Sequence, residues 1–121
     1  IMYLGAIFWT LGFDTIYGFQ DIEDDEIIGV KSTSIKFKKN PKLLLKLCYS
    51  IFIICFIVSG FMLNFRNFYF ILMIIPIYHL FFIQIKNLNI KKPDNCLKLF
   101  KKNNDLGFII FIILLLSKLI N

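Results

Sequence analysis

Long apolar runs with almost no charge are the feature that most limits how this chain can fold. Three of them cover residues 43–63, 68–85 and 106–120, and a shorter run opens the chain at residues 1–13. A helix needs about 20 apolar residues to cross the hydrocarbon of a bilayer, where its backbone polar groups must be satisfied internally. The runs therefore predict an all-α integral membrane protein, built as a bundle of transmembrane helices.

The composition agrees with a membrane protein and gives no support to nucleic-acid binding. Hydrophobic residues make up 58% of the chain, whereas soluble domains contain about 45–50% apolar residues. The net charge of +6 comes from lysines that flank the apolar runs, so we expect a lipid bilayer and no nucleic acid as partner. Cys48, Cys55 and Cys96 form no CxxC pair. Cys48 and Cys55, seven residues apart on one predicted helix, are expected to pack as small apolar residues.

The distribution of basic residues predicts the topology. The linkers 31–46 and 86–102 contain all the basic residues except Arg66 and Lys118. Basic residues concentrate in cytoplasmic loops, so both linkers are expected on the cytoplasmic side and the C-terminus on the far side. In a mitochondrion the matrix takes the place of the cytoplasm, although a bacterial inner membrane fits the pattern best.

Four helices are expected, at about residues 1–28, 43–63, 68–85 and 106–120. Pro76 should kink the third of them, because proline removes one backbone hydrogen bond. His79, in the same run, is expected to bond to another helix or to satisfy the carbonyls that the proline leaves free. The chain opens on Ile1 inside a run too short to span a bilayer. We therefore expect the whole chain to be the C-terminal part of one membrane domain whose N-terminal half is absent.

Six of the eight carboxylates lie in one stretch, DTIYGFQDIEDDEIIGVKST, which directly follows the first apolar run. At about 100° per helical residue, Asp14, Asp21 and Asp25 share a face with Tyr17, and Asp24 lies at its edge. Carboxylates that crowd together near hydrocarbon repel one another and favour a bound cation. Mg²⁺ takes carboxylate oxygens and shares its other sites with phosphate.

This face predicts a magnesium site made by Asp14, Asp21, Asp24 and Asp25. The alternative is a solvated acidic helix end that pairs with nearby lysines. Just downstream, Lys31 and Ser32 are candidates to contact a diphosphate. For Lys31 the alternative is a contribution to the positive-inside charge alone.

The stretch resembles the second aspartate-rich motif of the UbiA superfamily of membrane prenyltransferases, and is most similar to the 4-hydroxybenzoate polyprenyltransferase branch. The matching positions are Asp14, Thr15, Tyr17, Asp21, Asp24, Asp25, Gly29, Lys31, Ser32 and Thr33. A second segment, CLKLFKKNNDLGFIIF, resembles the entry to the last helix of that family. Its matching positions are Cys96, Phe100, Asn103, Asn104, Gly107 and Phe111.

The resemblance implies a helical bundle around a central cavity and a Mg²⁺-dependent reaction of ubiquinone biosynthesis. In that reaction a polyprenyl group moves from polyprenyl diphosphate to the ring of 4-hydroxybenzoate. The resemblance implies that Asp21 and Asp25 are the catalytic, metal-facing pair, supported by Asp14 and Asp24. Lys31 and Ser32 would contact the diphosphate and Tyr17 would line the site.

The first aspartate-rich motif of the family has no counterpart in the sequence. We therefore expect the isolated chain to be inactive. Two other functions stay open: prenylation of another aromatic or quinone precursor, and a transporter or structural subunit that binds cations without chemistry.

Overall fold

The structure is a computed structural model that describes all 121 residues, and it contains helices and no strands. In chain order the elements are α1 (Met2–Gly18), the 3₁₀ turn η1 (Phe19–Asp21), α2 (Ile22–Ile28), α3 (Thr33–Lys36), α4 (Pro41–Met62), α5 (Asn67–Leu72), α6 (Ile74–Tyr78), the π-helical segment η2 (His79–Ile85) and α7 (Pro93–Ile120). Three helical segments are long and apolar enough to cross a membrane: Pro41–Met62, Asn67–Ile85 and Pro93–Ile120. The predicted all-α membrane bundle is confirmed.

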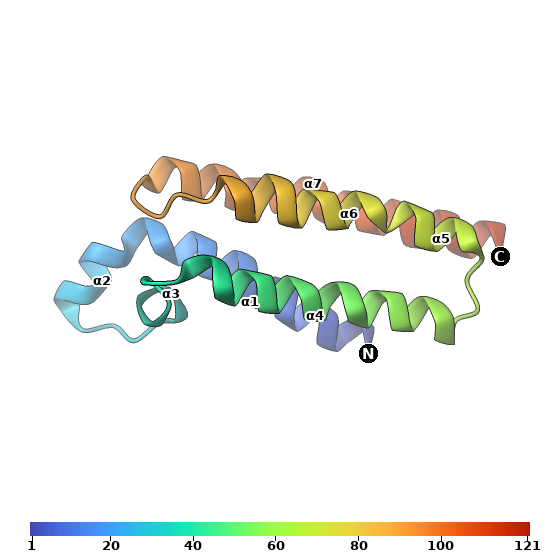
Figure 1. Cartoon of the computed structure of the whole chain (residues 1–121), viewed down its shortest axis with the longest axis horizontal. Helices are drawn as coiled ribbons and strands as arrows, with labels where there is room; N and C mark the ends of the chain where they lie inside the picture. Colours follow the sequence, from blue (N-terminus) through green and yellow to red (C-terminus); the bar gives the residue numbers. More distant parts are fainter.

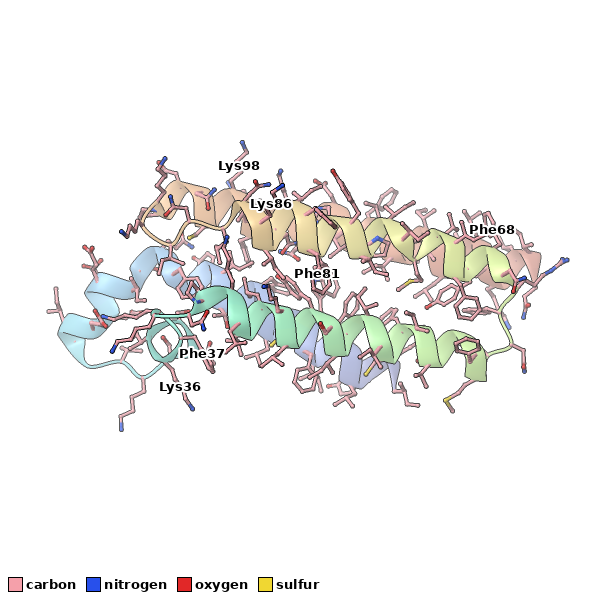
Figure 2. All side chains as sticks on the ribbon, in the orientation of Figure 1. Lys36, Phe37, Phe68, Phe81, Lys86 and Lys98 are labelled. Carbon is pink, nitrogen blue, oxygen red and sulfur yellow. The ribbon has the colours of Figure 1, made fainter.

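The long helices run antiparallel in two layers (Figure 1). One layer holds α1 and α4, and the other holds α7 and the rod formed by α5, α6 and η2. Both termini and the α4–α5 turn lie at one end, whereas α2, α3 and the loop before α7 lie at the other. Figure 2 shows Lys36, Lys86 and Lys98 toward the end that carries α2 and α3, and Phe68 at the opposite end. The two lysine-rich linkers therefore lie at the same end as the acidic stretch.

Proline breaks the third rod where the sequence predicts a kink. Helix α5 ends at Leu72 and α6 begins at Ile74. Pro76 has no N–H to bond the carbonyl of Leu72, four residues earlier, so the helical ladder is interrupted there.

Helix α7 begins at Pro93, well before the expected start near residue 106. Its first turns carry exposed Lys98 and Lys101 on one side and bury Cys96 and Leu99 on the other. The apolar run therefore marks only the part of the helix that is apolar on all sides, while its amphipathic start extends into the predicted linker.

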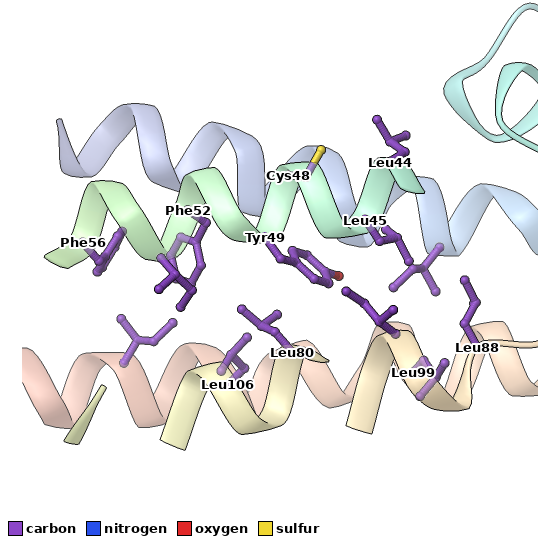
Figure 3. Close-up of a cluster of buried hydrophobic side chains, with 14 of the residues drawn as sticks. Leu44, Leu45, Cys48, Tyr49, Phe52, Phe56, Leu80, Leu88, Leu99 and Leu106 are labelled. Carbon is purple, nitrogen blue, oxygen red and sulfur yellow. The ribbon is translucent and has the colours of Figure 1, made fainter. Parts of the chain in front are cut away.

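The two layers enclose a core of aromatic and aliphatic side chains. Tyr49 and Phe52 of α4 point toward Leu80 and Leu106 in the opposite layer (Figure 3), and all four are fully buried. All three cysteines are buried free thiols, which confirms the prediction made for Cys48 and Cys55.

Glycines let α1 approach α4 closely. A Cβ added to Gly5 would lie 2.9 Å from the Cβ of Cys55, and one added to Gly12 would overlap the ring of Tyr49. Small residues at a helix crossing let the two backbones approach closely. Close packing of this kind holds helices together in a membrane, where the hydrophobic effect does not drive them to associate. The position of α1, and of the acidic stretch that follows it, therefore depends on these two glycines.

Candidate functional site

The acidic stretch is divided among three elements and does not belong to the single helix expected over residues 1–28. Helix α1 ends at Gly18, the 3₁₀ turn η1 follows, and α2 begins after Asp21, which has non-helical backbone angles. Gly18 packs against the Ser34 side chain so closely that a Cβ would overlap it. A 3₁₀ turn rotates about 120° per residue. The predicted alignment of Asp14 with Asp21 on one helix face, which assumes a continuous α-helix, therefore does not hold across this turn. Asp21 and Asp25 keep their spacing at the start of α2.

The carboxylates that the sequence selects have no basic partner. Asp14, Asp21 and Asp24 are exposed and Asp25 is half-buried. The single ion pair of the chain joins Lys38 to Glu26, a residue outside the predicted set. A surface pair of this kind contributes little stability. The alternative was an acidic helix end that pairs with nearby lysines. Glu26 makes such a pair, and the four aspartates do not.

The chain alone does not bring three metal-binding side chains together. No group of three or more His, Cys, Asp or Glu residues is arranged to hold a metal ion. The donor chemistry nevertheless fits, because unpaired carboxylate oxygens are the ligands that Mg²⁺ takes. The assignment of Asp14, Asp21, Asp24 and Asp25 to a metal stays a prediction.

The turn after α2 is closed by glycine. Gly29 adopts a left-handed conformation with φ 78°, its N–H donates to the carbonyl of Glu26, and the N–H of Val30 donates to that of Asp25. This is the double hydrogen bond of a Schellman motif, which favours glycine at the left-handed position. Gly29, two residues before Lys31, therefore ends α2.

Hydroxyl groups attach the segment after this turn to α1. The hydroxyls of Thr15 and Thr33 are 2.8 Å apart, and Ser34 Oγ donates to the carbonyl of Thr15 at 2.9 Å. Ser32 Oγ caps α3 by accepting from the N–H of Ile35 at 3.2 Å. The hydroxyl hydrogen of Ser32 is not used in that bond.

Lys31 is exposed and lines a shallow hollow together with Ser32 and Lys36. Two lysines and two hydroxyl residues are among those that line this hollow, so its chemistry suits an anion. The contact of Lys31 and Ser32 with a diphosphate stays a prediction.

An aromatic groove lies between α1 and α7. It encloses about 370 Å³, and its walls include Trp9, Phe13, Phe100, Asn103 and Gly107. The Phe13 and Phe100 rings have centroids 5.8 Å apart and meet edge to face. Such pairs stabilise packing beyond their buried area.

Tyr17 continues this wall toward the acidic stretch. Its ring centroid is 4.8 Å from that of Phe100, and its side chain is 45% exposed. The predicted role of Tyr17 in lining a site matches its position on an accessible aromatic wall, while the contact with a substrate stays a prediction.

A buried polar network, which the sequence did not predict, connects α1, α4, η2 and α7. Gln84 Oε1 accepts from Tyr49 Oη at 2.7 Å and from Asn103 Nδ2 at 3.3 Å. Gln84 Nε2 donates to Asn103 Oδ1 at 3.0 Å and to His79 Nδ1 at 3.2 Å. Trp9 Nε1 also donates to Asn103 Oδ1, at 2.9 Å. A glutamine and a tyrosine inside otherwise apolar runs are the signal for such a network.

His79 does not make the bond expected of it. Its partner, Gln84, belongs to the same segment η2 and not to another helix or to a carbonyl freed by Pro76. The π-helical geometry explains the difference, because residues five apart lie on the same side of a helix of that kind.

Residues 1–115 match the UbiA prenyltransferase family. The chain belongs to this family. It is 34% identical over 119 residues to the mitochondrial 4-hydroxybenzoate polyprenyltransferase of Dictyostelium discoideum, covering 98% of the chain and 26% of that protein. It is 37% identical over 114 residues to the 4-hydroxybenzoate octaprenyltransferase of Psychromonas ingrahamii, covering 92% of the chain and 38% of that protein. A mitochondrial polyprenyltransferase of the same name from Aedes aegypti is 35% identical over 118 residues, covering 98% of the chain and 26% of that protein.

The chain thus spans from about a quarter to about two-fifths of the length of these relatives. No solved structure matches it significantly. The family membership is carried by nearly the whole chain, including the acidic stretch and the entry to α7.

Proposed function

We propose that the chain takes part in transferring a polyprenyl group from polyprenyl diphosphate to the ring of 4-hydroxybenzoate, a step of ubiquinone biosynthesis. The observation that carries the proposal is the set of four aspartates without a basic partner, on a stretch of the matched family region. The names of the relatives supply the substrates.

The acidic stretch and the segment after it would hold the diphosphate end of the substrate. Asp21 and Asp25 would hold Mg²⁺ for this purpose, with Asp14 and Asp24 in support. The metal, when bound, neutralises the negative charge that develops on the departing diphosphate. Lys31 and the free hydroxyl hydrogen of Ser32 contact the diphosphate oxygens directly.

The groove between α1 and α7 would hold the isoprenoid part. The allylic C–O bond breaks, and its electrons leave with the diphosphate. The ring carbon next to the phenol attacks the allylic cation and then loses its proton, which restores aromaticity. Aromatic faces such as those of Phe13, Tyr17 and Phe100 stabilise a nearby cation by their ring quadrupole.

The experiment that tests this function uses membranes in which the full-length gene is expressed. Labelled polyprenyl diphosphate, 4-hydroxybenzoate and Mg²⁺ are supplied, and prenylated 4-hydroxybenzoate is measured. We expect product that disappears with EDTA and returns with excess Mg²⁺. Product that forms equally well in EDTA contradicts the metal, and prenylation of a different aromatic acid alone would replace the proposed acceptor.

We expect no product in this assay when the 121-residue chain is expressed by itself, because it spans at most about two-fifths of the length of the relatives named above. Prenylation of 4-hydroxybenzoate by that chain in liposomes would contradict this part of the proposal.

We further propose that the acidic stretch faces the cytoplasm of a bacterium or the matrix of a mitochondrion. Its support is the excess of lysines at the end of the bundle that carries α2 and α3. A phosphatase that is active only outside the cytoplasm, fused after Asn121, should therefore be active. The same enzyme inserted after Lys39 should be inactive. The reverse pattern would contradict the topology.

A further inference from the structure

Trp9 is held in one orientation by two contacts with α7 along the edge of its ring that carries Nε1. It is the only tryptophan of the chain. Its Nε1 donates to Asn103 Oδ1 at 2.9 Å. Farther along the same edge, Cη2 would lie 3.2 Å from a Cβ added to Gly107, so α7 leaves just enough room for the indole. One helix therefore sets both the tilt and the depth of the ring.

Asn103 is itself fixed by the buried network. Its Oδ1 accepts from Trp9 and Gln84, and its Nδ2 donates to Gln84 Oε1 and to the carbonyls of Leu99 and Phe100, each at 3.3 Å. Asn103 is 6% exposed and Gln84 is fully buried. A buried amide with both its oxygen and its nitrogen bonded has little freedom to rotate, and it transmits that rigidity to the indole.

The ring that Asn103 holds forms one wall of the α1–α7 groove. On α1 the residues Trp9, Phe13 and Tyr17 follow each other at intervals of four, so they lie along one side of the helix. Asp14 lies four residues beyond Thr10, which also lines the groove. Thr10 in the groove wall therefore lies one helical turn before Asp14, one of the unpaired aspartates, near the C-terminal end of α1.

We propose that Asn103 is a positioning residue, which holds the Trp9 indole as the wall against which the isoprenoid chain of the diphosphate substrate lies. This inference rests on the function proposed above. Aromatic rings line a groove beside the helix that carries Asp14, which matches an isoprenoid chain with an anionic, metal-bound head. Asn103 touches the wall and not the reacting atoms, so it acts through Trp9.

The test compares Asn103→Leu with Tyr49→Phe. Leucine keeps the size of asparagine but cannot accept from Trp9 Nε1. Tyr49→Phe removes a hydrogen bond to Gln84 on the side of the network that does not touch Trp9. Both variants weaken the same buried network and should lower thermal stability, so Tyr49→Phe shows what a loosened network does when the bond to Trp9 is kept.

The first readout is the emission of Trp9 in the 121-residue chain, in lipid nanodiscs and without any ligand. Asn103→Leu should move the emission maximum to shorter wavelength, because the indole N–H loses its acceptor, while Tyr49→Phe should leave it in place. An unchanged emission in Asn103→Leu, or an equal shift in both variants, overturns the positioning of Trp9 whatever the function of the protein.

The second readout is the kinetics of prenyl transfer in membranes in which the gene is expressed. Asn103→Leu should raise the KM for polyprenyl diphosphate about tenfold, as expected for the loss of one buried hydrogen bond, with a smaller change in kcat. The KM for 4-hydroxybenzoate and both KM values of Tyr49→Phe should stay within about twofold of wild type. Equal KM changes in both variants overturn the proposal. Wild-type membranes without prenyl transfer show instead that the proposed function has failed, together with the substrate assigned to the groove.

Discussion

Asp21→Ala is expected to lower the rate of prenyl transfer by at least about a hundredfold in membranes that express the gene, because one preorganised charge partner of the leaving group is lost. Asp21 is exposed, has no basic partner, and stands at the cap of α2. The side chain therefore supports no packing whose loss would mimic the effect. Product formation at saturating substrates, measured over a range of Mg²⁺ concentrations, checks the prediction.

Glu23→Ala is the matched control. Glu23 is also exposed, lacks a basic partner and lies two residues away in the same stretch, but falls outside the predicted metal set. Its removal should leave the rate within about threefold of wild type, as is usual for surface substitutions away from a site. If Glu23→Ala slows the reaction as much as Asp21→Ala does, the acidic stretch acts through its total charge. If Asp21→Ala keeps full activity, the metal assignment is wrong.

Gly12→Val is expected to lower the free energy of unfolding by about 3 kcal/mol or more, since it overfills a packed interface and displaces a buried hydrogen-bonded ring. The valine side chain would overlap the ring of Tyr49, which is fully buried and bonded to Gln84. The helices α1 and α4 must then separate, or Tyr49 must leave its partner. Unfolding in mixed micelles by increasing SDS, followed by circular dichroism, measures the change.

The background variant Tyr49→Ala tests this cause. It destabilises the bundle by itself, because it leaves a cavity, but it also removes the atoms that a valine at position 12 would meet. In that background Gly12→Val should cost much less than in the wild type, and the difference measures the coupling of the two sites. Equal costs in both backgrounds would show that Gly12 matters for its backbone conformation and not for the contact with Tyr49.

The sequence predicts the helices well, and their interruptions less well. Apolar runs reveal α4 and α7 because a membrane requires them, and Pro76 reveals the break after α5 because its effect is local. The 3₁₀ turn at Phe19–Asp21 was missed. It accompanies the contact between Gly18 and Ser34, which are sixteen positions apart in the sequence, and no periodicity on either side marks such a contact.

The same distinction applies to the candidate site. The spacing of Asp21 and Asp25 lies within one short segment and could be predicted. The network of Gln84 and Asn103 joins two segments of the upper layer in Figure 1 to Trp9 and Tyr49 in the lower one. Each residue alone is an ordinary polar side chain, so their partnership appears only when the helices are packed.

The mutual bonding of Gln84 and Asn103 also limits how the family can drift in sequence. Each amide satisfies the other, with Gln84 Nε2 donating to Asn103 Oδ1 and Asn103 Nδ2 donating to Gln84 Oε1. Replacing one by an apolar residue removes two hydrogen bonds from the other, which stays buried, so the single replacement is expected to destabilise the bundle. A change at only one of the two positions therefore gives a less stable intermediate sequence. The two positions should therefore evolve as a unit, changing together across homologues or not at all.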